Sequence, residues 1–212
     1  MSHEVKKYFE MTTQEFDSLY EEDKPVKYFL NGFLRKGLYE RVFLTIKEMD
    51  NSKGFSVFDI GCGSGRNSVL FAKTGASKVL GIDFSENMLD LAREYSERRN
   101  MAWICEFVNG DFMEYRSEEM FDYCIALGVF DYLGEPLPFL KKMRGMCRRK
   151  VIVSFPGKSL VRAPLRKIRY SLRGCPLFFY SKEEVEKLFR DAGFGEYSVV
   201  PYASSGYLGI GW

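Results

Sequence analysis

The sequence contains a single histidine, His3, and its five cysteines form no C-x-x-C pair. A histidine so near the start of a chain is rarely held rigidly, so catalytic triads and histidine-ligated metal sites are nearly excluded. Scattered cysteines of odd number predict no disulfide framework and indicate a reducing compartment. We therefore expect no metal site and a cytoplasmic location.

The sequence also lacks a membrane span and a strong charge of either sign. No apolar run approaches the roughly 20 residues that cross a bilayer, and no apolar signal-peptide region opens the chain. The 31 lysines and arginines nearly balance the 29 acids, and the net charge of +2 argues against a nucleic-acid partner. No feature predicts an oligomeric state. At 212 residues the chain is most simply one domain.

Alternating strands and helices predict an α/β fold with a mainly parallel sheet. The pattern predicts strands at residues 55–60, 78–82, 103–108, 150–155, 197–202 and 207–212, and one more directly after Asp122.

A glycine-rich turn follows the first of these strands and precedes a helix. Its glycines are Gly61, Gly63 and Gly65. A strand, a glycine turn and a helix in this order are typical of a nucleotide site. The NAD fingerprint, however, would place its third glycine where Arg66 stands, and the carboxylate of Asp59 would repel a pyrophosphate. A cationic ligand suits this acid better.

This stretch resembles the first motif of class I S-adenosylmethionine (SAM)-dependent methyltransferases, which is two apolar residues, an acid, any residue and G-x-G-x-G. The matching residues are Val57, Phe58, Asp59, Ile60, Gly61, Gly63 and Gly65. The resemblance covers residues 55–212 and implies SAM as the cofactor. It also implies a three-layer α/β sandwich whose seven-stranded sheet is mainly parallel, with the last strand antiparallel. Residues 1–54 are then an N-terminal helical lid or packing segment.

Asp83 ends the second predicted strand, where doubly wound folds place a carboxylate on the ribose. A carboxylate can accept hydrogen bonds from both vicinal hydroxyls, so Asp83 is the expected ribose ligand and Phe84 the expected neighbour of the adenine. The alternative is that Asp83 caps the following helix.

Asp111 and Phe112 follow the third predicted strand. In the family an acid at this place often accepts a hydrogen bond from the adenine amino group, and an apolar neighbour lies against the ring. The resemblance therefore implies an adenine site here. A plain Asn-Gly turn with a surface aspartate is the competing interpretation.

Phe121 and Asp122 precede a further apolar strand, which resembles the family's fourth motif. The end of that strand implies contact between Leu127 and the methionine part of SAM. Asp131 and Tyr132 are weak candidates for a catalytic base, and a helix-start aspartate explains Asp131 equally well. The segment lacks the Asn/Asp-Pro-Pro-Tyr/Phe tetrad of enzymes that methylate amino groups of nucleic-acid bases or glutamine.

Two further segments are candidates for the substrate side. Residues 29–49 carry apolar residues at helical spacing, so they either pack on the sheet or belong to a lid with Tyr28 as a substrate contact. A basic insertion at residues 157–180 contains no acid and follows the fifth strand, where open α/β sheets bind ligands. Its candidates for holding a carboxylate or phosphate are Arg162, Arg166 and Arg169. A solvated charged face is the equal alternative.

The resemblance implies transfer of a methyl group from SAM to an oxygen, nitrogen or carbon nucleophile of a small, anionic molecule. Three alternatives stay open: a non-catalytic SAM-binding protein, an RNA methyltransferase and, least favoured, an NAD(P)-dependent oxidoreductase.

Overall fold

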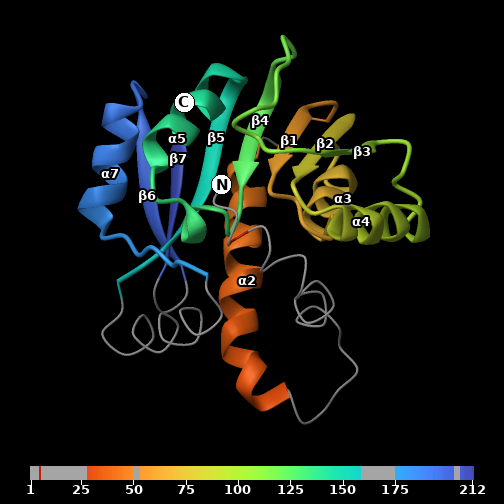
Figure 1. Ribbon diagram of the computed structural model, residues 1–212, viewed down its shortest axis with the longest axis horizontal. Coiled ribbons are helices and arrows are strands. Elements are labelled where there is room, and N and C mark those ends of the chain that lie inside the picture. The colour runs from red at the N-terminus through yellow and green to blue at the C-terminus, as the bar shows by residue number, and fades with distance from the viewer. Residues whose placement is uncertain (1–4, 6–27, 50–52, 159–174, 203–205) are drawn as a thin grey trace.

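The computed structural model describes residues 5, 28–49, 53–158, 175–202 and 206–212, with the backbone alone for 28–36 (Figure 1). Its elements are α2 (Tyr28–Glu48), β1 (Ser56–Ile60), α3 (Arg66–Lys73), β2 (Lys78–Asp83), α4 (Glu86–Arg98), β3 (Cys105–Asn109), β4 (Phe121–Ala126), the 3-10 turn η2 (Phe130–Tyr132), α5 (Pro136–Gly145), β5 (Cys147–Pro156), α7 (Lys182–Asp191), β6 (Tyr197–Tyr202) and β7 (Gly206–Gly211).

The seven strands form one sheet in the order β3-β2-β1-β4-β5-β7-β6. The pairings from β3 to β5 are parallel, whereas β7 runs antiparallel to both β5 and β6. The prediction of a mainly parallel sheet with its last strand antiparallel is therefore confirmed. From β1 the chain proceeds outward to β2 and β3, and from β4 it proceeds the other way. The topological switch point, where open α/β sheets bind ligands, lies between the carboxyl ends of β1 and β4.

Side chains alternate between two cores, one on each face of the sheet. Along β5, Val151, Val153 and Phe155 belong to the core covered by α5 and α7. Ile152 points the other way, into the core covered by α2, α3 and α4. Burying each such side chain stabilises the fold by roughly 1.5–3 kcal/mol. Two helical layers with the sheet between them give the three-layer sandwich that the sequence predicts.

Helix α2 lies along the second of these cores. Val42 and Ile46 pack against it, and α2 contacts β6 and β7. The N-terminal half of α2 extends past the edge of the sheet where β4 ends (Figure 1). The C-terminal part of the predicted lid or packing segment therefore packs on the sheet. Residues 1–4 and 6–27 of that segment lie outside the described residues. In the described part of the chain, no helix is both long and apolar enough to cross a membrane.

Candidate active site

Backbone hydrogen bonds tie the glycine turn to the carboxyl end of β2. The N–H groups of Gly61 and Cys62 both donate to the carbonyl oxygen of Ile82, at 2.8 and 3.2 Å. Gly65 ends the turn with a φ of +70°, and a Cβ added there would lie 2.7 Å from the Cβ of Ala92 on α4. The turn is therefore pressed closely against α4. A Cβ added to Gly63 would meet nothing within 4 Å, so the backbone there borders open space that a ligand can use.

Asp83 holds the turn and the start of α4 together. One carboxylate oxygen accepts from the N–H of Gly63 at 2.9 Å, and the other accepts from the N–H of Ser85 at 3.0 Å. Ser85 itself caps α4 by accepting from the N–H of Met88, so the cap of this helix is Ser85 and not Asp83. A carboxylate has about four acceptor positions, so both oxygens keep capacity for ribose hydroxyls. Burial raises the pKa of Asp83 despite these hydrogen bonds.

Asp59 lies beneath the same turn and is only 2% exposed. The hydroxyl of Ser68, in the first turn of α3, donates to its carboxylate at 2.6 Å. Burial raises the pKa of Asp59 to about 7; the Ser68 hydrogen bond opposes this shift and the charge of Asp83 adds to it. Two buried acids beside open backbone suit a ligand that has positive charge and vicinal hydroxyls. The residues present therefore fit SAM.

Asp111 and Phe112 lie beyond β3 in different surroundings from each other. Asp111 stabilises its own turn, because its carboxylate accepts from the N–H of Met113 at 3.0 Å. The ring of Phe112 is buried in the core, with its centroid 4.7 Å from that of Phe139 and 5.7 Å from that of Phe58. Contact of either side chain with adenine stays a prediction, and the burial of Phe112 does not favour a contact through its ring.

The carboxyl end of β4 leads into the buried turn η2. Leu127 is buried in the α2 side of the core. Asp131 and Tyr132 lie within η2 and are also buried, and the carbonyl of Asp131 accepts from the N–H of Phe178 at 2.8 Å. Asp131 lies in the first turn of η2, as the helix-start account expects, although no side chain caps this turn.

A small apolar cluster forms a wall beside η2. Its members are Val5, Tyr132, Cys175 and Leu177, with Phe84 and Phe179 packed against them. The expected neighbour of the adenine, Phe84, thus packs against a cluster that includes Cys175 and Leu177 from the C-terminal part of the basic insertion. The structure brings Phe84 and Tyr132 into one wall, although they follow different strands.

Three polar residues at this edge were not predicted from the sequence. Arg41 of α2 lies over the backbone of Gly128, just beyond β4. The hydroxyl of Ser154 on β5 accepts from the N–H of Gly128 at 2.8 Å. Tyr202, at the end of β6, lies within interaction range of both Ser154 and Arg41. The only sequence signals were a serine in an apolar strand and an arginine within an apolar helix, and neither residue type identifies its partner.

The basic insertion leaves and rejoins the fold at one place. Gly157 forms a parallel bridge with Tyr180, and the N–H of Lys158 donates to the carbonyl of Tyr180 at 3.2 Å. Both ends of the insertion therefore lie at the carboxyl end of β5. The predicted substrate contacts Arg162, Arg166 and Arg169 lie outside the described residues, and the side chain of Tyr28 does too.

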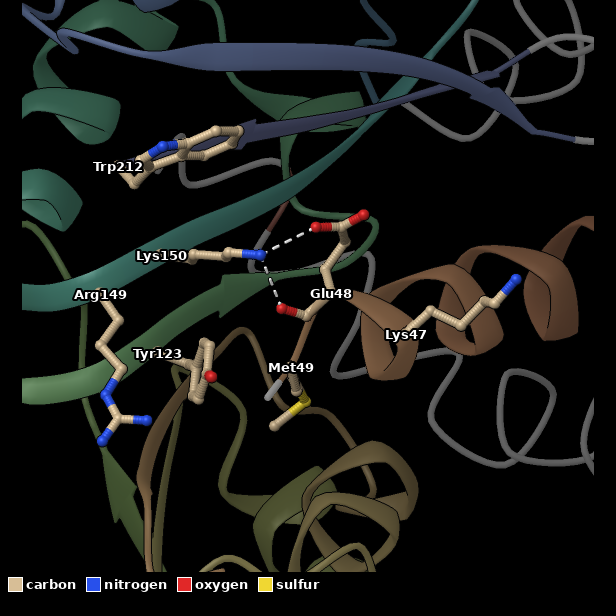
Figure 2. A pocket seen from close by; sticks show the side chains of 7 residues that line it. All are labelled: Lys47, Glu48, Met49, Tyr123, Arg149, Lys150 and Trp212. Atoms are coloured by element: carbon tan, nitrogen blue, oxygen red, sulfur yellow. Dashed lines mark hydrogen bonds and ion pairs between the residues drawn. The ribbon is translucent and has the colours of Figure 1, made fainter. Parts of the chain in front are cut away.

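A pocket of about 430 Å³ lies at the opposite, amino end of the parallel strands (Figure 2). Its lining residues are Lys47, Glu48, Met49, Tyr123, Arg149, Lys150 and Trp212. Lys150 forms an ion pair with Glu48 at 3.0 Å, and its ammonium group lies 5.5 Å from the centre of the Trp212 ring. This pocket is separate from the glycine turn and contains none of the predicted cofactor ligands.

Comparisons with known proteins agree with this geometry. Residues 57–150 match a family described as "Methyltransferase domain". A demethylmenaquinone methyltransferase from Staphylococcus aureus is 31% identical over 179 aligned residues, which cover 70% of this chain and 71% of the relative.

Solved structures share the fold over nearly the whole chain. A magnesium protoporphyrin IX methyltransferase from Synechocystis PCC 6803, crystallised with bound S-adenosylhomocysteine, superposes with a TM-score of 0.79 at 22% identity, covering 97% of this chain and 96% of its own. A SAM-dependent methyltransferase from Thermotoga maritima gives a TM-score of 0.70 at 20% identity and covers 98% of both chains.

Proposed function

Because this chain belongs to the class I SAM-dependent methyltransferases, we propose that it methylates an oxygen, nitrogen or carbon nucleophile of a small, anionic molecule. The observation that carries the cofactor half of this proposal is the double hydrogen bonding of Asp83 beside the open backbone of Gly63. The acceptor half is supported by the place where the basic insertion joins the fold, at the carboxyl end of β5.

The residues at the end of β1 and β2 would hold the cofactor. The carboxylate of Asp83 would accept from the ribose hydroxyls, and Phe84 would flank the adenine. The buried carboxylate of Asp59 would attract the positively charged end of SAM across the glycine turn. Asp111, Phe112 and Leu127 complete the proposed set, and Phe112 is the most buried of these three residues.

SAM supplies a methyl carbon that is already activated on a sulfonium, so a nucleophile can displace the neutral thioether in one step. The protein's contribution is then to align the acceptor and to exclude water, which can supply roughly 7–11 kcal/mol. The wall of Tyr132, Cys175 and Leu177 is buried and apolar, as such exclusion requires. A carboxylate acceptor would need no base.

A hydroxyl acceptor would need a proton acceptor close to the reacting oxygen. Asp131 is the candidate that we favour, because it brings a carboxylate to the buried turn η2, just beyond β4. Burial raises the pKa values of Tyr180 and Tyr202, and the charge of Asp131 raises them further. Tyr132 contributes its ring to the wall.

Small-molecule relatives favour this acceptor class over RNA. The S. aureus relative is named for demethylmenaquinone, and the Synechocystis neighbour for magnesium protoporphyrin IX. Both names denote small molecules, and the near-neutral net charge of this chain agrees. Affinity for RNA that falls steeply with salt would instead favour an RNA methyltransferase.

The test begins with calorimetric titration of the purified protein with SAM, S-adenosylhomocysteine and NADH. We expect micromolar binding of the first two and none of NADH. Asp83→Ala should weaken both by about 100-fold, since it removes charge-assisted hydrogen bonds to the ribose. Unchanged affinity in a folded Asp83→Ala variant would contradict the ribose assignment.

The acceptor is then sought with methyl-labelled SAM and matched pairs of small acids and their neutral esters or amides. We expect label to enter the anionic member of a pair at least tenfold faster. Equal labelling of both members would contradict the anionic acceptor but not the methyltransferase. SAM binding without transfer to any acceptor class, including RNA, would favour the non-catalytic alternative.

A further inference from the structure

A guanidinium group lies directly over the backbone at the end of β4. A Cβ added to Gly128 would lie 3.1 Å and 3.3 Å from the two terminal nitrogens of Arg41. Gly128 has a φ of +84°, and its N–H is fixed by the hydroxyl of Ser154 at 2.8 Å. Helix α2 thus brings a positive charge to the switch point of the sheet, and a side chain at position 128 would displace it.

The surroundings of Arg41 hold its side chain in place. The hydroxyl of Tyr202 lies within interaction range of both Arg41 and Ser154, so α2, β5 and β6 meet at one polar cluster. Burial raises the pKa of Tyr202, against the opposing charge of Arg41, which keeps the hydroxyl protonated at neutral pH. Next to Arg41 along α2, Val42 packs in the core. The guanidinium is therefore preorganised, and little entropy remains to be lost on binding an anion.

The order of the strands fixes which end of the cofactor would reach this cluster. Asp83 ends β2, and β1 lies between β2 and β4. A ligand whose ribose lies at Asp83 and which crosses the glycine turn of β1 must have its other end over β4. The turns that follow β1 and β4 adjoin, since a Cβ on Gly61 would lie 2.4 Å from the side chain of Val129.

The end of SAM opposite the nucleoside is an α-amino acid with one ammonium and one carboxylate. Asp59 and Asp131 supply negative charge near the turns that follow β1 and β4, which suits the ammonium. The carboxylate needs a cation, and arginine presents paired N–H donors that match the geometry of a carboxylate. Arg41 is the guanidinium that the described residues place over β4.

We propose that Arg41, held by Tyr202, binds the α-carboxylate of SAM, so that α2 is part of the cofactor site as well as a packing helix. This inference rests on the proposed function. It assigns a cofactor-binding role to a helix for which the sequence suggested only packing or a lid. The competing occupant of the guanidinium is the anionic group of the acceptor.

The experiment compares SAM with decarboxylated SAM, which keeps the nucleoside, the sulfonium and the amine but lacks the α-carboxylate. Dissociation constants of both are measured by calorimetry for the wild type, Arg41→Lys and Arg41→Met. Wild type should prefer SAM by about 10- to 100-fold, the effect of a charge-assisted hydrogen-bonded pair. In Arg41→Met this preference should fall to about threefold or less, because SAM binds more weakly and the analogue does not. Arg41→Lys should keep part of the preference.

A second arginine–tyrosine pair provides the matched control. Arg190 of α7 hydrogen-bonds the hydroxyl of Tyr197 at 2.7 Å, at the other end of β6. Arg190→Met should leave the preference for SAM unchanged. Tyr202→Phe should reduce the preference for SAM by about three- to tenfold, because the guanidinium of Arg41 loses a contact that holds it in place. Tyr197→Phe should leave the preference unchanged.

The outcomes separate the possible roles of Arg41. Equal weakening of both ligands in Arg41→Met would overturn the proposal and assign Arg41 to folding alone. An unchanged preference with weaker binding of the acceptor would also overturn it and assign Arg41 to the acceptor. A wild type that binds neither SAM nor its analogue would contradict the proposed function itself.

Discussion

Charged groups are held in different ways at the two ends of the parallel strands. We call these the amino edge, where the parallel strands begin, and the carboxyl edge, where they end. At the amino edge, Asp122 is paired with Arg149 at 3.2 Å and Glu48 with Lys150 at 3.0 Å. At the carboxyl edge, Asp59 and Asp83 are held by a hydroxyl and by backbone N–H groups, and burial raises both pKa values. Charge paired with charge stabilises the fold. Charge held by dipoles costs stability and remains able to attract a cationic ligand.

The largest expected effect on stability comes from a substitution in the glycine turn, which lies over Asp59 and is hydrogen-bonded to Asp83. Gly65→Ala should lower the free energy of unfolding by roughly 2–5 kcal/mol, because left-handed backbone and a collision with Ala92 both oppose a Cβ. Gly63→Ala has only the backbone strain, since its Cβ would meet nothing, and should cost about 1–2 kcal/mol. Urea unfolding of both variants measures the difference. Equal losses would mean that contact with α4 does not shape the turn.

Asp59→Asn should stabilise the protein at pH 8 by roughly 1–3 kcal/mol while weakening SAM binding. The folded pKa of about 7 lies above the usual value of 3.8, so the folded state binds the proton more tightly than the unfolded state. Wild type therefore loses stability as pH rises from about 4 to about 7, and the variant should lose less, because only the contribution of the buried Asp83 remains. Urea unfolding across this range checks the prediction. A gap between the two proteins that does not change with pH would refute the buried-charge explanation.

Asp122→Ala should destabilise the protein, which is the opposite of the effect expected for Asp59→Asn, because this acid at the amino edge is paired. Its carboxylate accepts from the N–H and hydroxyl of Ser56, at 2.8 and 3.2 Å, as well as pairing with Arg149. We expect a loss of about 1–2 kcal/mol in the free energy of unfolding at pH 8. SAM affinity, measured by calorimetry, should stay within about twofold. A large loss of SAM affinity would show that the two edges are coupled.

The smallest effect is expected for Lys150→Met in the pocket of Figure 2. The side chains of Lys150 and Glu48 are about one third exposed, at 31% and 35%, so water screens their attraction. The variant should lose less than about 1 kcal/mol, and less still at high salt. Thermal unfolding at low and high salt measures both. A loss that salt leaves unchanged would point to packing against Trp212 rather than to charge.

Much of the fold could be predicted because its signals are local. The strand at 78–82 is observed as Lys78–Asp83, and the one at 197–202 as Tyr197–Tyr202. The strand predicted at 103–108 is observed at Cys105–Asn109, because residues 101–104 form a turn before pairing with β2 begins. Strand boundaries depend on hydrogen-bond partners elsewhere in the chain, which apolar runs do not reveal.

The candidate site was predictable only in part. Asp83 was found because its place after a strand and its distance from the glycine turn are features of the sequence alone. The bond between Ser68 and Asp59 was missed, since Ser68 reads as an ordinary helix-start residue. The burial of Phe112 among Phe58 and Phe139 was missed too, because the side on which a loop residue points is set by packing.

By itself the sequence determined the α/β class, the mainly parallel sheet and the glycine turn with its two acids. Those features follow from periodicity and from backbone conformations that span only a few residues. Tertiary structure alone decided that Arg41, Ser154 and Tyr202 meet over Gly128. The physical reason is that α2, β5 and β6 come together only through the packing of an apolar core. That packing fixes the position of α2 along the sheet and determines which of its residues faces β4.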